Sequence, residues 1–118
     1  MATYTKMPFS QSERGKGIQL NTNGTVTDIH QTLSHATTLD EIWIWVDNYG
    51  SLDLKVTIYF GDQAYQDSIE QTIRSESGLV LLVPGLVLGN SVTQELVQGF
   101  GPNASTTLIA YGYVNRIT

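Results

Sequence analysis

Short runs of alternating apolar and polar residues follow one another along the chain. The clearest run is Leu39 to Asp47, where Ile42, Ile44 and Val46 alternate with two tryptophans. Successive side chains of a strand point to opposite faces, so this run predicts a strand that is apolar on both faces. Such a strand either lies beneath another layer or contributes one face to a subunit interface.

Several other segments predict strands by the same pattern. Thr25 to Leu33 alternates, with Ile29 and Leu33 expected to point inward. Leu54 to Phe60 repeats the pattern after a turn signal, and we expect it to form a hairpin with the tryptophan strand. The remaining predicted strands are Ser68 to Arg74, Leu79 to Val83, Ser91 to Val97 and Thr106 to Ile117.

Two of these segments need a choice. Ile69 to Ile73 also fits one helical turn, but a β-branched pair between turn signals favours a strand. Leu79 to Val83 is expected to end at Pro84 and Gly85, because proline has no backbone N–H to donate. No segment has the periodicity of a helix of normal length.

The spacing of these segments predicts the fold class. Seven or eight short strands separated by turn signals are typical of a sandwich or jelly roll. We therefore expect an all-β, single-domain antiparallel β-sandwich, jelly-roll-like, over residues 18–118. Residues 1–17 are polar, contain Pro8 and show no sustained period, which predicts an extended N-terminal arm or an arm that ends in an edge strand.

Composition narrows the classes of partner. The 118 residues suit one domain, they include no cysteine, and their net charge is −5. An acidic chain is poorly suited to neutralise phosphates, so we expect no nucleic-acid partner. Since no apolar run approaches about 18 residues, we expect neither a membrane span nor a signal peptide.

Candidate chemistry is sparse. His30 and His35 are the only histidines, and we expect them at the surface or in a turn, with a shared metal site as the weaker alternative. Asp40 and Glu41 are adjacent and should point to opposite faces of a strand, so they do not form a catalytic pair. The segment from Asp47 to Asp53 fits an Asx-rich turn better than a calcium loop. We therefore expect that the chain is not an enzyme and that it has no catalytic, cofactor-binding or metal-binding residues.

Aromatic and basic residues supply the remaining candidates. An aromatic face is expected to form a subunit interface, with sugar stacking as the alternative, and comprises Trp43, Trp45, Tyr59, Tyr111 and Tyr113. The cations Lys6, Arg14 and Lys16 lie near the start of the chain. They indicate either an arm that contacts an acidic neighbour or a solvated end.

Three segments carry a resemblance to a known family. They are Thr37 to Trp45, Ser77 to Gly85, and Gly112 to Ile117. Together with their surroundings, over roughly residues 25 to 118, they resemble small virion structural proteins of tailed bacteriophages, particularly phages that infect cyanobacteria. These motifs are structural and not catalytic.

The resemblance implies a capsid decoration or cement protein that needs no cofactor. Its implied partners are the major capsid protein of a phage head and copies of itself in a homotrimer. It would be made in the host cytoplasm and lie on the virion head surface. The implied capsid contacts are the arm residues Tyr4, Lys6, Phe9, Arg14 and Lys16. The alternative is a receptor- or glycan-binding module of a phage tail or fibre.

Overall fold

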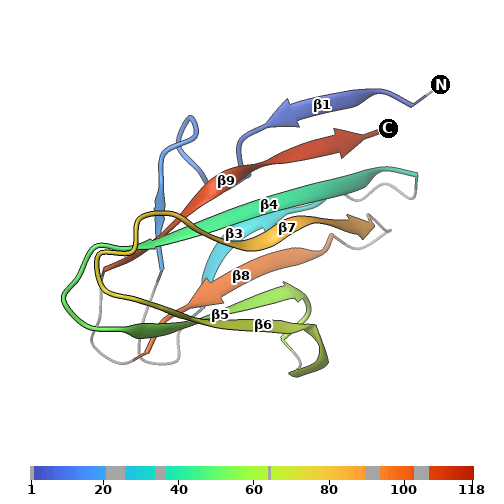
Figure 1. Ribbon diagram of the computed structural model, residues 1–118. Coiled ribbons are helices and arrows are strands. Elements are labelled where there is room, and N and C mark those ends of the chain that lie inside the picture. The colour runs from blue at the N-terminus through green and yellow to red at the C-terminus, as the bar shows by residue number, and fades with distance from the viewer. Residues whose placement is uncertain (1, 21–25, 34–36, 64, 90–93, 103–106) are drawn as a thin grey trace.

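The computed structural model describes residues 2–20, 26–33, 37–63, 65–89, 94–102 and 107–118. These residues form two antiparallel sheets (Figure 1). The five-stranded sheet has the order β1 (Tyr4–Met7), β9 (Leu108–Ile117), β4 (Leu39–Asn48) and β7 (Val80–Gly89), and β2 (Ile18–Gln19) also pairs with β9. The four-stranded sheet has the order β3 (Thr27–Gln31), β8 (Leu96–Phe100), β5 (Leu54–Gly61) and β6 (Ser68–Ile73). A 3₁₀ turn, η1 (Tyr65–Asp67), precedes β6.

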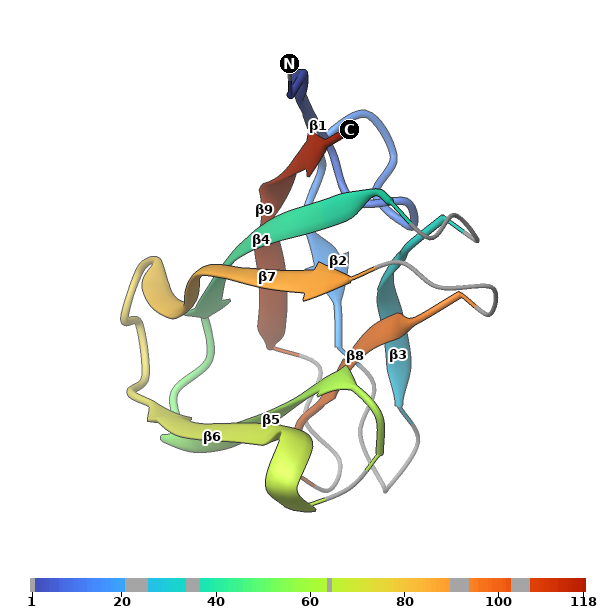
Figure 2. The same ribbon diagram turned by 90° about the vertical axis from the view of Figure 1, so that its right-hand side faces the viewer.

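The predicted all-β sandwich is confirmed. Figure 2 shows the two layers from the side, with β4 and β7 across from β5 and β6. The chain crosses between the sheets on passing from β2 to β3, β3 to β4, β4 to β5, β6 to β7, β7 to β8 and β8 to β9. The jelly-roll-like part of the expectation stays a prediction. Within the described residues, no helix has the length and apolar character needed to cross a membrane.

The core lies between the inner faces of the two sheets. The alternation expected for β4 is present, because Ile42, Ile44 and Val46 are fully buried. Val56 and Ile58 of β5 are also fully buried. Burying such side chains is the main favourable contribution to folding, at roughly 1.5–3 kcal/mol for each. Leu33 is an exception, because it follows the end of β3 and is exposed instead of pointing inward.

The predicted hairpin of β4 with β5 is wrong. β4 pairs with β7 and β9, whereas β5 pairs with β6 and β8 in the other sheet. Asn48 organises the turn between them: its side chain donates to the carbonyls of Leu52 and Ile73 and accepts from the Gly50 N–H. Turn residues specify that the chain reverses, but they do not specify which sheet it joins.

β6 and β7 correspond to the two segments whose secondary structure or end the sequence left open. Ser68–Ile73 is a strand, as favoured. The expected end at Pro84 is wrong, because β7 continues through Pro84 and Gly85 to Gly89. Proline is tolerated on an edge strand, and β7 lies at the edge of its sheet, with register shifts opposite Ile42/Trp43 and Ile44/Trp45.

The predicted arm lies against the domain in the described residues. β1 pairs with β9 from Tyr4↔Ile117 to Met7↔Val114, and β2 pairs further along the same edge of β9. Phe9, between these two strands, is part of the core. The segment is therefore an integral edge of the sandwich over much of its length.

Candidate functional site

The outer face of the five-stranded sheet carries a cluster of three aromatic rings. The centroids of Trp43 and Trp45 are 6.0 Å apart, and Tyr113 lies 6.2 Å from Trp43 and 6.1 Å from Trp45. The cluster follows from the register, since Trp43 is paired with Tyr113 across β4 and β9. Aromatic pairs at this distance stabilise one another by about 0.5–1.5 kcal/mol beyond their burial.

Polar groups border these rings. The indole N–H of Trp43 donates to Oε1 of Glu41 at 2.8 Å, and the Asn115 amide donates to the same oxygen at 3.0 Å. Both hydrogen bonds favour the charged carboxylate and lower the pKa of Glu41. Lys6 of β1 pairs in register with Asn115, and its ammonium lies 4.7 Å from the centroid of the Tyr113 ring, within the range of a cation–π contact.

Exposed aliphatic residues extend the surface along β7. Leu81 and Val87 pair in register with Trp45 and Glu41, so they share the outer face, and they are 44% and 49% exposed. The outer face of the four-stranded sheet differs, because it carries the exposed ion pair between Lys55 and Glu70 at 2.9 Å. It also carries one aromatic pair, Tyr59 and Phe100. The outer face of the five-stranded sheet has the larger aromatic and aliphatic surface and is here called the apolar face.

Two glycines let the backbone approach Trp43. Gly112 has φ 154, and a Cβ there would collide with the Trp43 carbonyl oxygen. Gly85 has φ 76, and a Cβ there would lie 2.7 Å from the Trp43 ring. L side chains rarely adopt these φ values, so glycine is required at both positions.

The structure brings together four of the five predicted interface residues. Tyr111 pairs in register with Trp45 and is exposed at the end of the cluster. Tyr59 does not join them, because it lies on β5 in the other sheet, where its ring contacts Phe100 at 5.6 Å. The alternation pattern assigned each aromatic residue to a face of its own strand but could not assign the strand to a sheet.

The predicted contact residues of the N-terminal segment divide into two groups. Tyr4, Lys6, Arg14 and Lys16 are exposed. Phe9 is 2% exposed and packs in the core, so it is not available for contact with another protein. Its aromatic side chain anchors the segment by burial.

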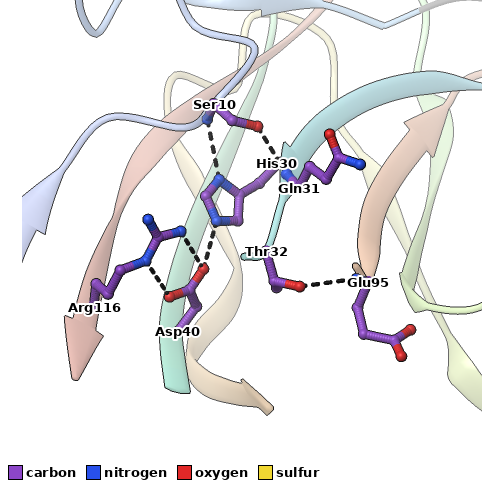
Figure 3. A network of polar contacts seen from close by, with 7 residues as sticks. All are labelled: Ser10, His30, Gln31, Thr32, Asp40, Glu95 and Arg116. Carbon is purple, nitrogen blue, oxygen red and sulfur yellow. Dashed lines mark hydrogen bonds and ion pairs between the residues drawn. The ribbon is translucent and has the colours of Figure 1, made fainter. Parts of the chain in front are cut away.

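A polar cluster, here called the clamp, has His30 and Asp40 buried at its centre and also includes Ser10 of the N-terminal segment and Arg116 (Figure 3). Arg116 donates to both carboxylate oxygens of Asp40 at 2.8 and 2.9 Å, and Nε2 of His30 lies 2.8 Å from Oδ2 of Asp40. The Ser10 backbone N–H donates to Nδ1 of His30 at 3.0 Å. The clamp thus joins the N-terminal segment to β3, β4 and β9.

These bonds define the protonation states in the clamp. Since Nδ1 of His30 accepts a hydrogen bond from Ser10, the ring proton lies on Nε2 and is donated to Asp40. Burial raises the pKa of Asp40, but the bonds from Arg116 and His30 outweigh it and lower that pKa to about 2. Both ring nitrogens of His30 are engaged, so the ring can accept no substrate proton while these bonds persist. The arrangement acts as a structural tie.

The expectation that His30 lies at the surface or in a turn is wrong. His30 is 1% exposed in β3, where the register shift between Asp28 and His30 turns it inward beside Ile29. The adjacent pair Asp40 and Glu41 does point to opposite faces, as predicted. His35 and the turn signal at residues 21–24 lie outside the described residues.

No group of three or more metal-binding side chains of the types His, Cys, Asp and Glu occurs among the described residues. Searches of protein-family models, curated proteins and solved structures find no match to this chain.

Proposed function

We propose that this chain is a structural protein of a phage virion that decorates the assembled head and stabilises it. The observation that carries the proposal is the contrast between the two outer faces. The outer face of the four-stranded sheet carries an ion pair and one aromatic pair, whereas that of the five-stranded sheet combines the aromatic cluster with exposed Leu81 and Val87. A contiguous apolar surface of this kind is typical of a protein–protein contact.

The occupant of the apolar face is proposed to be a second and third copy of the chain. A closed ring of identical subunits buries equivalent surfaces on every copy. Charged residues make up only 14% of the chain, so ion pairs with a partner would contribute little to association. Burial of apolar area then drives the association.

The stabilising mechanism would be thermodynamic. A decoration protein that binds the assembled shell and not the free capsid subunits shifts the balance against rupture by mass action. The exposed residues Tyr4, Lys6, Arg14 and Lys16 of the N-terminal segment are the proposed capsid contacts. No cofactor takes part in this mechanism.

The native mass of the purified chain, measured by light scattering, tests the self-association. Three copies of a 13.0-kDa chain are expected. Val87→Glu places a charge in the apolar face and should give a monomer, whereas the matched control Leu52→Glu changes an exposed loop leucine and should leave the mass unchanged. Trp45→Ala should also weaken assembly. A monomeric unaltered chain would contradict the proposed trimer.

Head binding is tested by co-sedimentation with assembled heads and with unassembled capsid protein of the phage that encodes the chain. Deletion of residues 2–16 is unsuitable, because it removes Phe9 from the core and Ser10 from the clamp. Point variants of the exposed residues avoid this problem. Equal binding to heads and to free capsid subunits would contradict the stabilising mechanism.

A tail- or fibre-associated glycan-binding module is the second candidate. The observation that favours it is the placement of Glu41 and Asn115 beside the Trp43 ring, since polar groups at the edge of an aromatic surface suit sugars. A monomer whose tryptophan fluorescence is quenched by a glycan would support this function over head decoration.

A further inference from the structure

A small cationic hollow lies where the N-terminal segment meets the end of the aromatic cluster. It has a volume of about 280 Å³, and its lining includes Lys6, Pro8, Arg14, Gly15 and Tyr113. Among the residues that the structure describes, no acidic side chain lines it. In a chain with a net charge of −5, two of the six lysine and arginine side chains therefore border one hollow.

We propose that this hollow, together with the open edge of β1, binds an extended acidic peptide segment of the partner. This inference rests on the proposed function and names the chemistry of the capsid contact. A carboxylate would enter the hollow between the Lys6 ammonium and the Arg14 guanidinium. The positive charges of lysine and arginine attract a carboxylate, and arginine can hold one through two parallel hydrogen bonds.

The main chain of β1 supplies the second part of the site. β1 is the last strand in the order of its sheet, and among the described strands none pairs with its outer side. An extended peptide can add to such an edge by main-chain hydrogen bonds, while its side chains occupy neighbouring pockets. Lys6 lies on β1 itself, so a peptide on this edge would pass the hollow.

The hollow is held in place before any ligand binds. Ser10 is tied to His30, the Ser12 hydroxyl donates to the Lys16 carbonyl at 2.7 Å, and the Lys16 N–H donates to the Glu13 carbonyl at 3.1 Å. These bonds fix the turn that carries Arg14. Preorganisation reduces the ordering cost of binding.

Arg14 remains available for a partner. Its only ion pair among the described residues is with Glu13 at 3.8 Å, and the side chains are 81% and 76% exposed. Such an exposed pair contributes little and exchanges readily for another carboxylate. The Lys6 ammonium, by contrast, is already positioned over Tyr113.

Other anionic ligands fit the observations less well. The hollow is slightly smaller than the cavities of about 300 Å³ or more that enclose a drug-sized ligand, so it suits one side chain of a larger partner. One face of the Tyr113 ring is covered by Lys6 and is not open to sugar stacking. A nucleic acid would meet the net negative charge of the rest of the chain.

The test uses the full chain, labelled for amide NMR, and a short peptide in which glutamate alternates with threonine. We expect shifts confined to β1, the turn at residues 13–16 and β9, and no binding of the matched glutamine peptide. Lys6→Gln and Arg14→Gln should each weaken binding about two- to fivefold. Lys55→Gln is the control, because Lys55 carries the same charge and is exposed, but it lies on β5 in the other sheet and does not line the hollow.

Four results would overturn the inference. They are absence of glutamate-peptide binding, equal binding of the glutamine peptide, an effect of Lys55→Gln as large as that of Arg14→Gln, and tighter binding of an oligouronate of matched charge. The native mass separates this inference from the proposed function. A monomer that binds the peptide would support the peptide site and refute the trimer. A trimer that does not bind the peptide would support the trimer and refute the peptide site.

Discussion

Replacement of Arg116 by methionine tests the clamp most directly. The change removes the cation that bonds both oxygens of Asp40, and it leaves a carboxylate that is fully buried. Removing one partner of a buried ion pair costs about 3–5 kcal/mol. That is a large share of the roughly 5–15 kcal/mol that holds a typical domain folded, so we expect a much lower urea midpoint.

The pH dependence of this loss gives the sharper result. The pKa of Asp40 is lowered from 3.8 to about 2 in the folded chain. A lowered folded-state pKa contributes stability above pH 3.8, about 2 kcal/mol here, and that contribution is lost as the pH falls toward 2. Without Arg116, burial is opposed by His30 alone, so the pKa of Asp40 rises. The deficit of Arg116→Met should therefore shrink between pH 7 and pH 3.

Urea unfolding at the two pH values, followed by tryptophan fluorescence, measures this deficit. Lys55→Met is the control, because it breaks the exposed pair with Glu70 and should change stability little at either pH. Adding Asp40→Leu to Arg116→Met should recover stability, since the unpaired charge is then gone. A deficit of Arg116→Met that is equal at pH 7 and pH 3 would refute the ion-pair reasoning.

Three further changes test other parts of the fold. His30→Phe removes the acceptor of the Ser10 N–H, so amide exchange at Ser10 should accelerate while β9 stays protected, as hydrogen exchange would report. Gly112→Ala would force a Cβ against the Trp43 carbonyl and should lower the melting temperature far more than Gly78→Ala, where nothing lies within 4 Å of the added atom. Asn48→Ala leaves the buried Ile73 carbonyl without its donor and should cost about 1–3 kcal/mol in urea unfolding. Equal melting temperatures for the two glycine variants, or an Asn48→Ala chain as stable as the original, would contradict these accounts.

The alternation of apolar and polar residues predicted the features that depend on a single strand. The alternation of Ile42, Ile44 and Val46 with the tryptophans predicted both faces of β4, because the period of a strand is fixed by backbone geometry. The same holds for β6, where β-branched residues between turns favoured the strand over one helical turn. These features depend on residues that are neighbours in the sequence.

The same pattern could not predict which distant segments pair with one another. The turn after β4 was recognised, but the sheet that β5 joins depends on the burial of Val56 and Ile58 opposite β4, and not on the turn residues. The clamp was missed for a similar reason. His30 and Arg116 lie 10 and 76 positions from Asp40, and no motif of fixed spacing connects them.

One register between β4 and β9 generates both the clamp and the aromatic cluster. It pairs Asp40 with Arg116 on the inner face and Trp43 with Tyr113 on the outer face. A slip of one residue would turn Asp40 toward solvent and Trp43 into the core, because side chains alternate along a strand. A buried carboxylate that meets Arg116 in this register and loses it in the next penalises that slip. The buried ion pair therefore helps to specify which face of the sheet presents the aromatic surface to a partner.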